Sequence, residues 1–73
     1  MNLHNHLKEL RLKNNLTQEY LAGVVGVTRQ TIISIEKEKF VPSVKLALEL
    51  AFALDAPIDE LFFLEENRGE NND

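Results

Sequence analysis

The spacing of apolar residues along the chain predicts a series of short helices. Leu3, Leu7 and Leu10 fall at helical intervals and indicate a first helix over residues 5–14. The asparagines that end this segment suit a turn, because asparagine tolerates a left-handed backbone. In chain order, the predicted helices cover residues 5–14, 18–25, 28–37, 44–54 and 58–61.

The segment 18–36 predicts two short helices joined by a tight corner. Thr17 and Thr28 precede the two helices and can cap them through their side-chain oxygens. A glycine at the corner allows the sharp turn that ends the first helix, and a small residue before it allows close helix approach. The residues expected to hold this unit together are Ala22, Gly26, Val27, Ile32 and Ile35.

The outward face of the second helix carries side chains suited to DNA. Arg29 can pair with guanine and Gln30 with adenine, while Thr and Ser contact phosphates, base edges or a thymine methyl group. The first residues of a recognition helix face the major groove, and a helix N-terminus with a polar side chain suits a phosphate. A merely solvated face is the alternative. The predicted DNA contacts are Gln18, Thr28, Arg29, Gln30, Thr31, Ser34, Lys37 and Lys39.

The C-terminal half is much more apolar. The helix that starts after Pro42 and its expected cap Ser43 is apolar on nearly every side over residues 44–54, which indicates burial on more than one side. In so small a chain, this favours contact with a partner subunit. The run 62–64 would be covered by a partner or packed within one subunit, and an extended 62–66 would pair with residues 1–4 as a small sheet.

Composition narrows the classes of function. The 73 residues make one domain with a small core, and the absence of cysteine fits a reducing cytoplasm. No apolar run is long enough to span a membrane. His4 and His6 lack a third ligand nearby and are interpreted as a surface pair, so no metal or other cofactor is expected. Without cysteine or a convergent carboxylate pair, an enzyme is not predicted.

The net charge of −4 is unusual for a DNA-binding protein, but it is unevenly distributed. Residues 1–40 hold six basic and four acidic side chains, whereas residues 41–73 hold two basic and eight acidic ones. The local field near the groove matters more than the total charge. We expect a domain over residues 1–64 and an acidic, disordered tail over residues 65–73.

The chain resembles the helix-turn-helix transcription regulators of the Cro and phage-repressor type, the Xre family, over residues 3–64. The resemblance implies a compact, all-α, five-helix lambda-repressor-like domain that binds operator DNA as a homodimer. It also implies a salt bridge between Arg11 and Glu36. The motifs that carry it are Leu16-Thr17-Gln18, Leu21-Ala22, Gly26-Val27-Thr28, Gln30-Thr31-Ile32, Ile35-Glu36 and Pro42-Ser43. The dimer interface that it implies consists of Phe52, Leu54, Ile58, Leu61, Phe62, Phe63 and Leu64.

Two residues depart from the family pattern. Ile33 occupies an outward position that is usually polar, and Glu38 stands where the family commonly has glycine. A positive φ is disfavoured for glutamate, so the loop 37–40 is expected to run differently or to carry strain. The acidic total charge and Glu38 leave open a protein-interaction module on the same fold, and the acidic half leaves open an antitoxin that binds a toxin there. The leading hypothesis is a sequence-specific transcriptional repressor that binds an inverted repeat as a homodimer.

Overall fold

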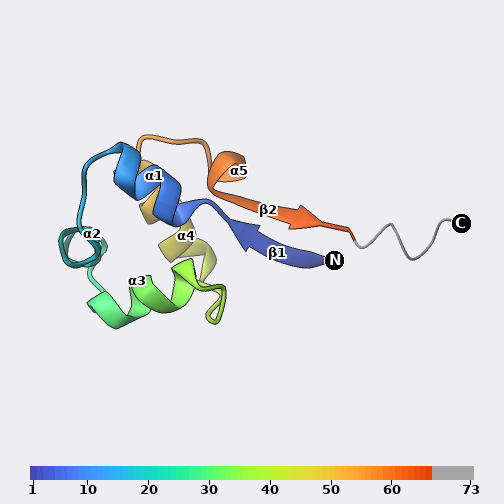
Figure 1. Cartoon of the computed structure of the whole chain (residues 1–73), viewed down its shortest axis with the longest axis horizontal. Helices are drawn as coiled ribbons and strands as arrows, with labels where there is room; N and C mark the ends of the chain where they lie inside the picture. The colour runs from blue at the N-terminus through green and yellow to red at the C-terminus, as the bar shows by residue number, and fades with distance from the viewer. Residues whose placement is uncertain (67–73) are drawn as a thin grey trace, which may run out of the picture.

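The computed structural model describes residues 1–66 and shows five short helices and one two-stranded sheet (Figure 1). The two strands lie side by side and project from the helical body, and they bring the two ends of the described chain together. The helical domain with a small terminal β pairing is therefore confirmed. In chain order, the elements are β1 (Asn2–Asn5), α1 (Leu7–Lys13), α2 (Gln18–Val25), α3 (Arg29–Glu36), α4 (Val44–Ala53), α5 (Ile58–Leu61) and β2 (Phe62–Glu65).

Capping residues start three of the helices. The side chains of Thr17, Thr28 and Ser43 each accept a hydrogen bond from the backbone N–H three residues later, at 3.0, 3.3 and 3.1 Å. These bonds satisfy donors of the first turn that have no partner within the helix. The threonine and serine caps expected for α2, α3 and α4 are thus all present.

The first helix is shorter than predicted. Residues 2–5 form β1, which pairs antiparallel with β2 so that Leu3 lies opposite Leu64 and Asn5 opposite Phe62. The Asn5 side-chain oxygen accepts from the backbone N–H of Leu7, where the helix begins. The expectation that the helix starts at residue 5 was wrong, because strand pairing with the C-terminal segment determines the conformation here.

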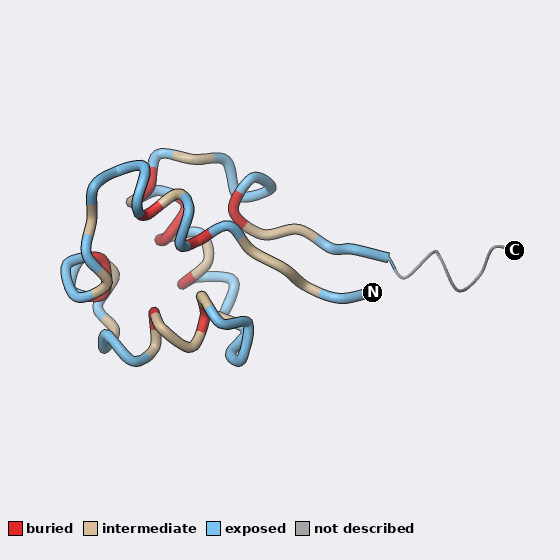
Figure 2. The backbone as a smooth tube through the Cα atoms, in the orientation of Figure 1, coloured by how far each residue is buried: buried red, intermediate tan, exposed pale blue. Residues whose placement is uncertain are grey.

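All five helices contribute to one small core. Figure 2 shows their buried segments turned toward the middle of the helical body, whereas the outer ends of the two strands are exposed. Because each helix is at most ten residues long, its stability depends on this shared apolar contact. The buried apolar residues are Leu7, Leu21, Ala22, Ile32, Ile35, Leu46, Leu50, Ala51, Leu54 and Leu61.

The boundary expected after residue 64 is slightly too early, because Glu65 belongs to β2. From residue 67 onward, the predicted tail lies outside the described residues. Within the described part of the chain, none of the helices has the length and apolar character needed to cross a membrane.

Candidate nucleic-acid interface

The corner between α2 and α3 is built as a tight helix-to-helix turn. Gly26 adopts a left-handed φ of 76°, and the next N–H, of Val27, donates to the Ala22 carbonyl at 2.9 Å. Ala22 is nearly buried, and Ile32 and Ile35 of α3 are fully buried against the same core. These contacts fix the orientation of α3 relative to α2 and leave its opposite face free.

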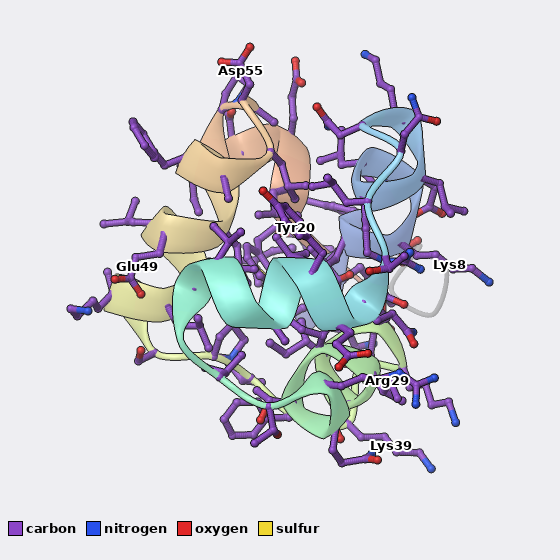
Figure 3. All side chains as sticks on the ribbon, turned by 90° about the vertical axis from the view of Figure 1, so that its left-hand side faces the viewer. Lys8, Tyr20, Arg29, Lys39, Glu49 and Asp55 are labelled. Carbon is purple, nitrogen blue, oxygen red and sulfur yellow. The ribbon has the colours of Figure 1, made fainter. Side chains whose placement is uncertain are left out.

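The free face of α3 is polar. Arg29 and Gln30 are exposed, and Thr31 and Ser34 are half-buried on the same helix. The Gln30 amide donates to the Ser34 hydroxyl at 3.4 Å, and the Thr28 and Thr31 hydroxyls lie 3.1 Å apart. The surface here is slightly hollowed and is lined by Thr28, Gln30, Thr31, Ser34, Lys39 and Phe40. In Figure 3, Arg29 and Lys39 extend outward on the same side of the molecule, whereas Glu49 of α4 lies on another.

A buried ion pair connects the end of α3 to α1. Arg11 Nε donates to Glu36 Oε2 at 2.7 Å, and the two side chains are only 8% and 6% exposed. Arg11 Nη1 also donates to the Leu16 carbonyl, and the Gln18 amide donates to Glu36 Oε1 at 3.1 Å. The pair implied by the family resemblance is therefore present, and it joins α1, the start of α2 and the end of α3.

Gln18 consequently has a structural contact that sequence reasoning did not foresee. One of its amide N–H groups is directed to Glu36, while the residue itself remains half-buried at the N-terminus of α2. Thr17 accepts from the N–H of Tyr20, and the N–H groups before it in the first turn lack helical partners and are suited to a phosphate oxygen. The donors available at this position are therefore backbone N–H groups at least as much as the Gln18 side chain.

The loop after α3 contains the unusual glutamate. Glu38 has a φ of 62°, so it occupies the left-handed region where glycine is favoured. Its carboxylate accepts from the backbone N–H of Asn5 at 3.3 Å and lies 3.1 Å from His4 Nδ1. The flanking Lys37 and Lys39 are exposed. The Glu38 carboxylate is thus directed at β1. This contact could not be predicted without knowing that the N-terminal segment forms a strand.

A separate apolar patch lies on α4. Val44, Leu48 and Phe52 are 76%, 53% and 89% exposed and recur every four residues, so they share one side of the helix. A mostly apolar groove of about 210 Å³ adjoins this patch; its lining residues are Leu3, Val41, Pro42, Val44, Ala47, Leu48, Ile58 and Phe62.

The structure corrects two residues of the expected dimer interface. Leu54 and Leu61 are 2% and 0% exposed, because they belong to the core of the single chain. Phe63 is half-buried and stacks on His6 with ring centroids 4.7 Å apart. Of the other residues of the expected interface, Phe52, Ile58 and Leu64 are exposed and Phe62 is half-buried, and Phe52 belongs to the α4 patch.

A capped helix pair with a glycine corner and an exposed polar second helix defines a DNA-binding helix-turn-helix protein. Among residues 1–66, no group of histidine and acidic side chains is arranged to hold a metal ion. The helix-turn-helix family model matches residues 7–61, and the chain belongs to this family, in its Xre-type branch. It is a transcription regulator with a DNA-binding fold and not an enzyme.

Relatives and solved structures agree with this assignment. The chain is 49% identical to an uncharacterized helix-turn-helix transcriptional regulator of Methanocaldococcus jannaschii, over 86% of this chain and 96% of the relative. It is 47% identical to the regulator YgzD of Bacillus subtilis, over 85% and 94% of the two chains. The structure of the restriction-modification controller protein C.AhdI from Aeromonas hydrophila superposes with a TM-score of 0.69 at 37% identity, covering 74% of this chain and 78% of that one.

Proposed function

We propose that this regulator is a sequence-specific repressor that binds an inverted-repeat operator as a homodimer, with α3 in the major groove. The observation that carries the proposal is the polar, exposed face of α3, which is held by a buried ion pair and a fully buried isoleucine framework. A rigidly supported helix can present its first residues to base edges with a fixed register. A protein that binds operator DNA acts where that DNA is, so we also propose that it is cytoplasmic.

The proposal assigns two kinds of contact to the face of α3 and its surroundings. Base edges are read by Arg29, Gln30, Thr31 and Ser34, whose donors and acceptors suit the major groove. Phosphates are bound by Gln18, Thr28, Lys37 and Lys39, which flank this face at both ends. Phosphate contacts set affinity and orientation, while the base contacts give sequence preference.

The homodimer is supported by the exposed apolar side of α4. Three large side chains that remain 53% to 89% exposed on one helix are costly in water and are suited to an isologous contact with a second copy. A two-fold dimer would place two copies of α3 in successive major grooves, roughly 34 Å apart. An inverted-repeat operator matches that symmetry.

The first experiment tests sequence preference. The protein selects duplexes from a random library, and the selected duplex is then titrated at 50 and 200 mM salt with wild type, Arg29→Ala and Gln30→Ala. Loss of a bidentate base contact is expected to lower affinity about tenfold to a hundredfold, mainly for the selected sequence. Lys8→Ala, which removes an exposed charge from α1, is the control for general electrostatics.

A protein that binds all duplexes equally, with no effect of either α3 substitution, would refute the reading of bases and favour a protein-interaction module on this fold. Repression is tested by placing the selected duplex over a promoter that drives a reporter gene. Expression of the wild-type protein should lower the reporter signal, and Arg29→Ala should restore it. A rise in signal with the wild-type protein would instead identify an activator.

The second experiment tests the dimer with a matched pair of variants. Leu48 on α4 and Val24 on α2 are both 53% exposed. Leu48→Lys should give a folded monomer in sedimentation, because it inserts a charge into the apolar contact, whereas Val24→Lys should remain dimeric. Equal behaviour of the two variants would contradict an interface on α4.

A further inference from the structure

His4 lies between two carboxylates that come from opposite directions. Its Nδ1 is 3.1 Å from Glu38 Oε1 in the loop after α3, and its Nε2 is 2.9 Å from Glu65 Oε1 of β2. The His4 side chain is 29% exposed, and its ring is also 5.7 Å from the Phe63 ring. The ring therefore joins the terminal sheet to the loop that follows the recognition helix.

The His4 ring is the hydrogen-bond donor of this contact. Ionised carboxylates only accept hydrogen bonds, and a neutral imidazole has only one N–H to donate. Both contacts of His4 are satisfied together when both of its nitrogens carry a proton. Glu38 and Glu65 thus both lie within hydrogen-bonding distance of the same ring, one on either side.

The sheet also contacts the end of α3 itself. The Asn5 side chain donates to the carbonyl of Ile35 at 2.9 Å, and its backbone N–H donates to Glu38 Oε2 at 3.3 Å. These bonds satisfy a carbonyl of the last helical turn and hold the Glu38 carboxylate toward β1. They also secure a residue whose left-handed φ is unfavourable for a glutamate.

The position of Glu38 matters because of its neighbours. Lys37 and Lys39 flank it, are exposed, and form no ion pair with another residue of the described chain. A freely rotating carboxylate between two such lysines would repel a phosphate and compete with it for both cations. A carboxylate that is held by His4 leaves both lysines available.

We propose that His4 is a positioning residue for DNA binding, because it holds the Glu38 carboxylate toward β1 so that both loop lysines stay available and the loop after α3 can approach the phosphate backbone. This inference rests on the proposed DNA-binding function. It assigns the terminal sheet a role in placing the recognition helix and its loop, in addition to any role in stability.

A double-mutant cycle on the full chain tests the assignment. The affinity for the selected duplex is measured for wild type, His4→Gln, Glu38→Gln and the double variant at 50 mM salt, with folding checked by circular dichroism. We expect His4→Gln to weaken binding about fivefold to tenfold, because each subunit then presents near phosphate an acid that the ring no longer holds. Glu38→Gln should bind as well as wild type or better, and the double variant should bind like Glu38→Gln.

The rescue by Glu38→Gln is the decisive result, since a purely structural role of His4 would not be restored by removing an acid. His6→Gln is the matched control, because its ring stacks on Phe63 and makes no contact with Glu38. This control should leave affinity unchanged.

Equal losses from His4→Gln in both backgrounds, no loss in either, or weakened binding by Glu38→Gln alone would overturn the inference. If the wild-type protein selects no duplex at all, the proposed function fails and the inference fails with it. If the wild type selects a duplex but the cycle shows no coupling, only the inference fails.

Discussion

The Arg11–Glu36 ion pair allows a test of how strongly burial sets the strength of a salt bridge. A second pair, Lys45–Glu49 on α4, has the same N–O distance of 2.7 Å. The side chains of the first pair are 8% and 6% exposed, whereas those of the second are 82% and 41% exposed. Glu36→Ala and Glu49→Ala therefore remove the same chemical group at the same distance in two very different environments.

The expected magnitude follows from what remains around Arg11 once the carboxylate is gone. Breaking a buried pair by removing one partner costs about 3–5 kcal/mol, because the remaining charge is buried without compensation. Arg11 keeps its hydrogen bond to the Leu16 carbonyl at 2.8 Å, so we expect the lower end, about 3 kcal/mol. Glu49→Ala should cost only about 0.3–0.5 kcal/mol, as exposed pairs within a helix do.

Urea unfolding followed by circular dichroism measures both values, with every variant at one protein concentration, since dimerisation would add to the apparent stability. In thermal melts, Glu36→Ala should lower the midpoint by about 12–24 °C for a domain of this size. Replacing both partners, with Arg11→Met and Glu36→Leu, should recover much of the loss because no buried charge is left. Losses that agree within about 0.5 kcal/mol for Glu36→Ala and Glu49→Ala would refute the reasoning.

Three further pairs of substitutions test local features of the fold, by the same unfolding assay except where sedimentation is named. Gly26→Ala should destabilise the fold by about 1–2 kcal/mol because of the φ of 76° alone, since nothing lies near the added Cβ. Gly23→Ala, inside α2, should instead stabilise it by about 0.5–1 kcal/mol. The opposite order of stabilities would contradict the left-handed corner. Thr17→Ala should cost about 1 kcal/mol through the lost cap, and Thr17→Ser should restore most of it. Leu54→Ala should cost about 2–5 kcal/mol of stability, because it truncates a core side chain. Phe52→Ala, at an 89% exposed site, should instead weaken self-association in sedimentation. A reversed pattern would contradict the corrected interface.

The helix-turn-helix unit could be predicted from the sequence because each of its stabilising features depends on residues close together in the chain. Thr17 and Thr28 cap the helices that directly follow them, and Gly26 supplies the positive φ of the corner at the position where the apolar repeat breaks. Such features depend on a few neighbouring residues and on backbone sterics. These features could therefore be predicted without knowledge of the rest of the fold.

The start of the first helix was predicted wrongly because a distant segment decides it. Leu3 stands at helical spacing from the apolar residues after it, yet it pairs with Leu64 across the sheet. Periodicity over so few residues cannot distinguish these two cases. The contact between His4 and Glu38 was missed for the same reason, since it exists only when the N-terminus is extended.

The apolar helix α4 shows a different limit of sequence reasoning. Leu50 and Leu54 are buried, whereas Leu48 and Phe52, which alternate with them along the chain, are exposed. Because the segment is apolar on nearly every side, no contrast with polar residues marks which side faces the core. Only the packing of α4 against its neighbours separates core residues from those available to a partner.

The structure also explains how an acidic chain can present a basic surface to DNA. The segment from α3 through its loop contains two acids, and both have partners: Glu36 is buried against Arg11, and the more exposed Glu38 contacts His4 and the Asn5 N–H. Its exposed cations, Arg29 and the two loop lysines, form no ion pair with another described residue. A phosphate approaching this face therefore meets a more positive field than residue counts suggest, because what matters is which charges remain unpaired nearby. Among the described acids of the C-terminal half, Glu49 and Asp55 lie on other sides of the molecule (Figure 3).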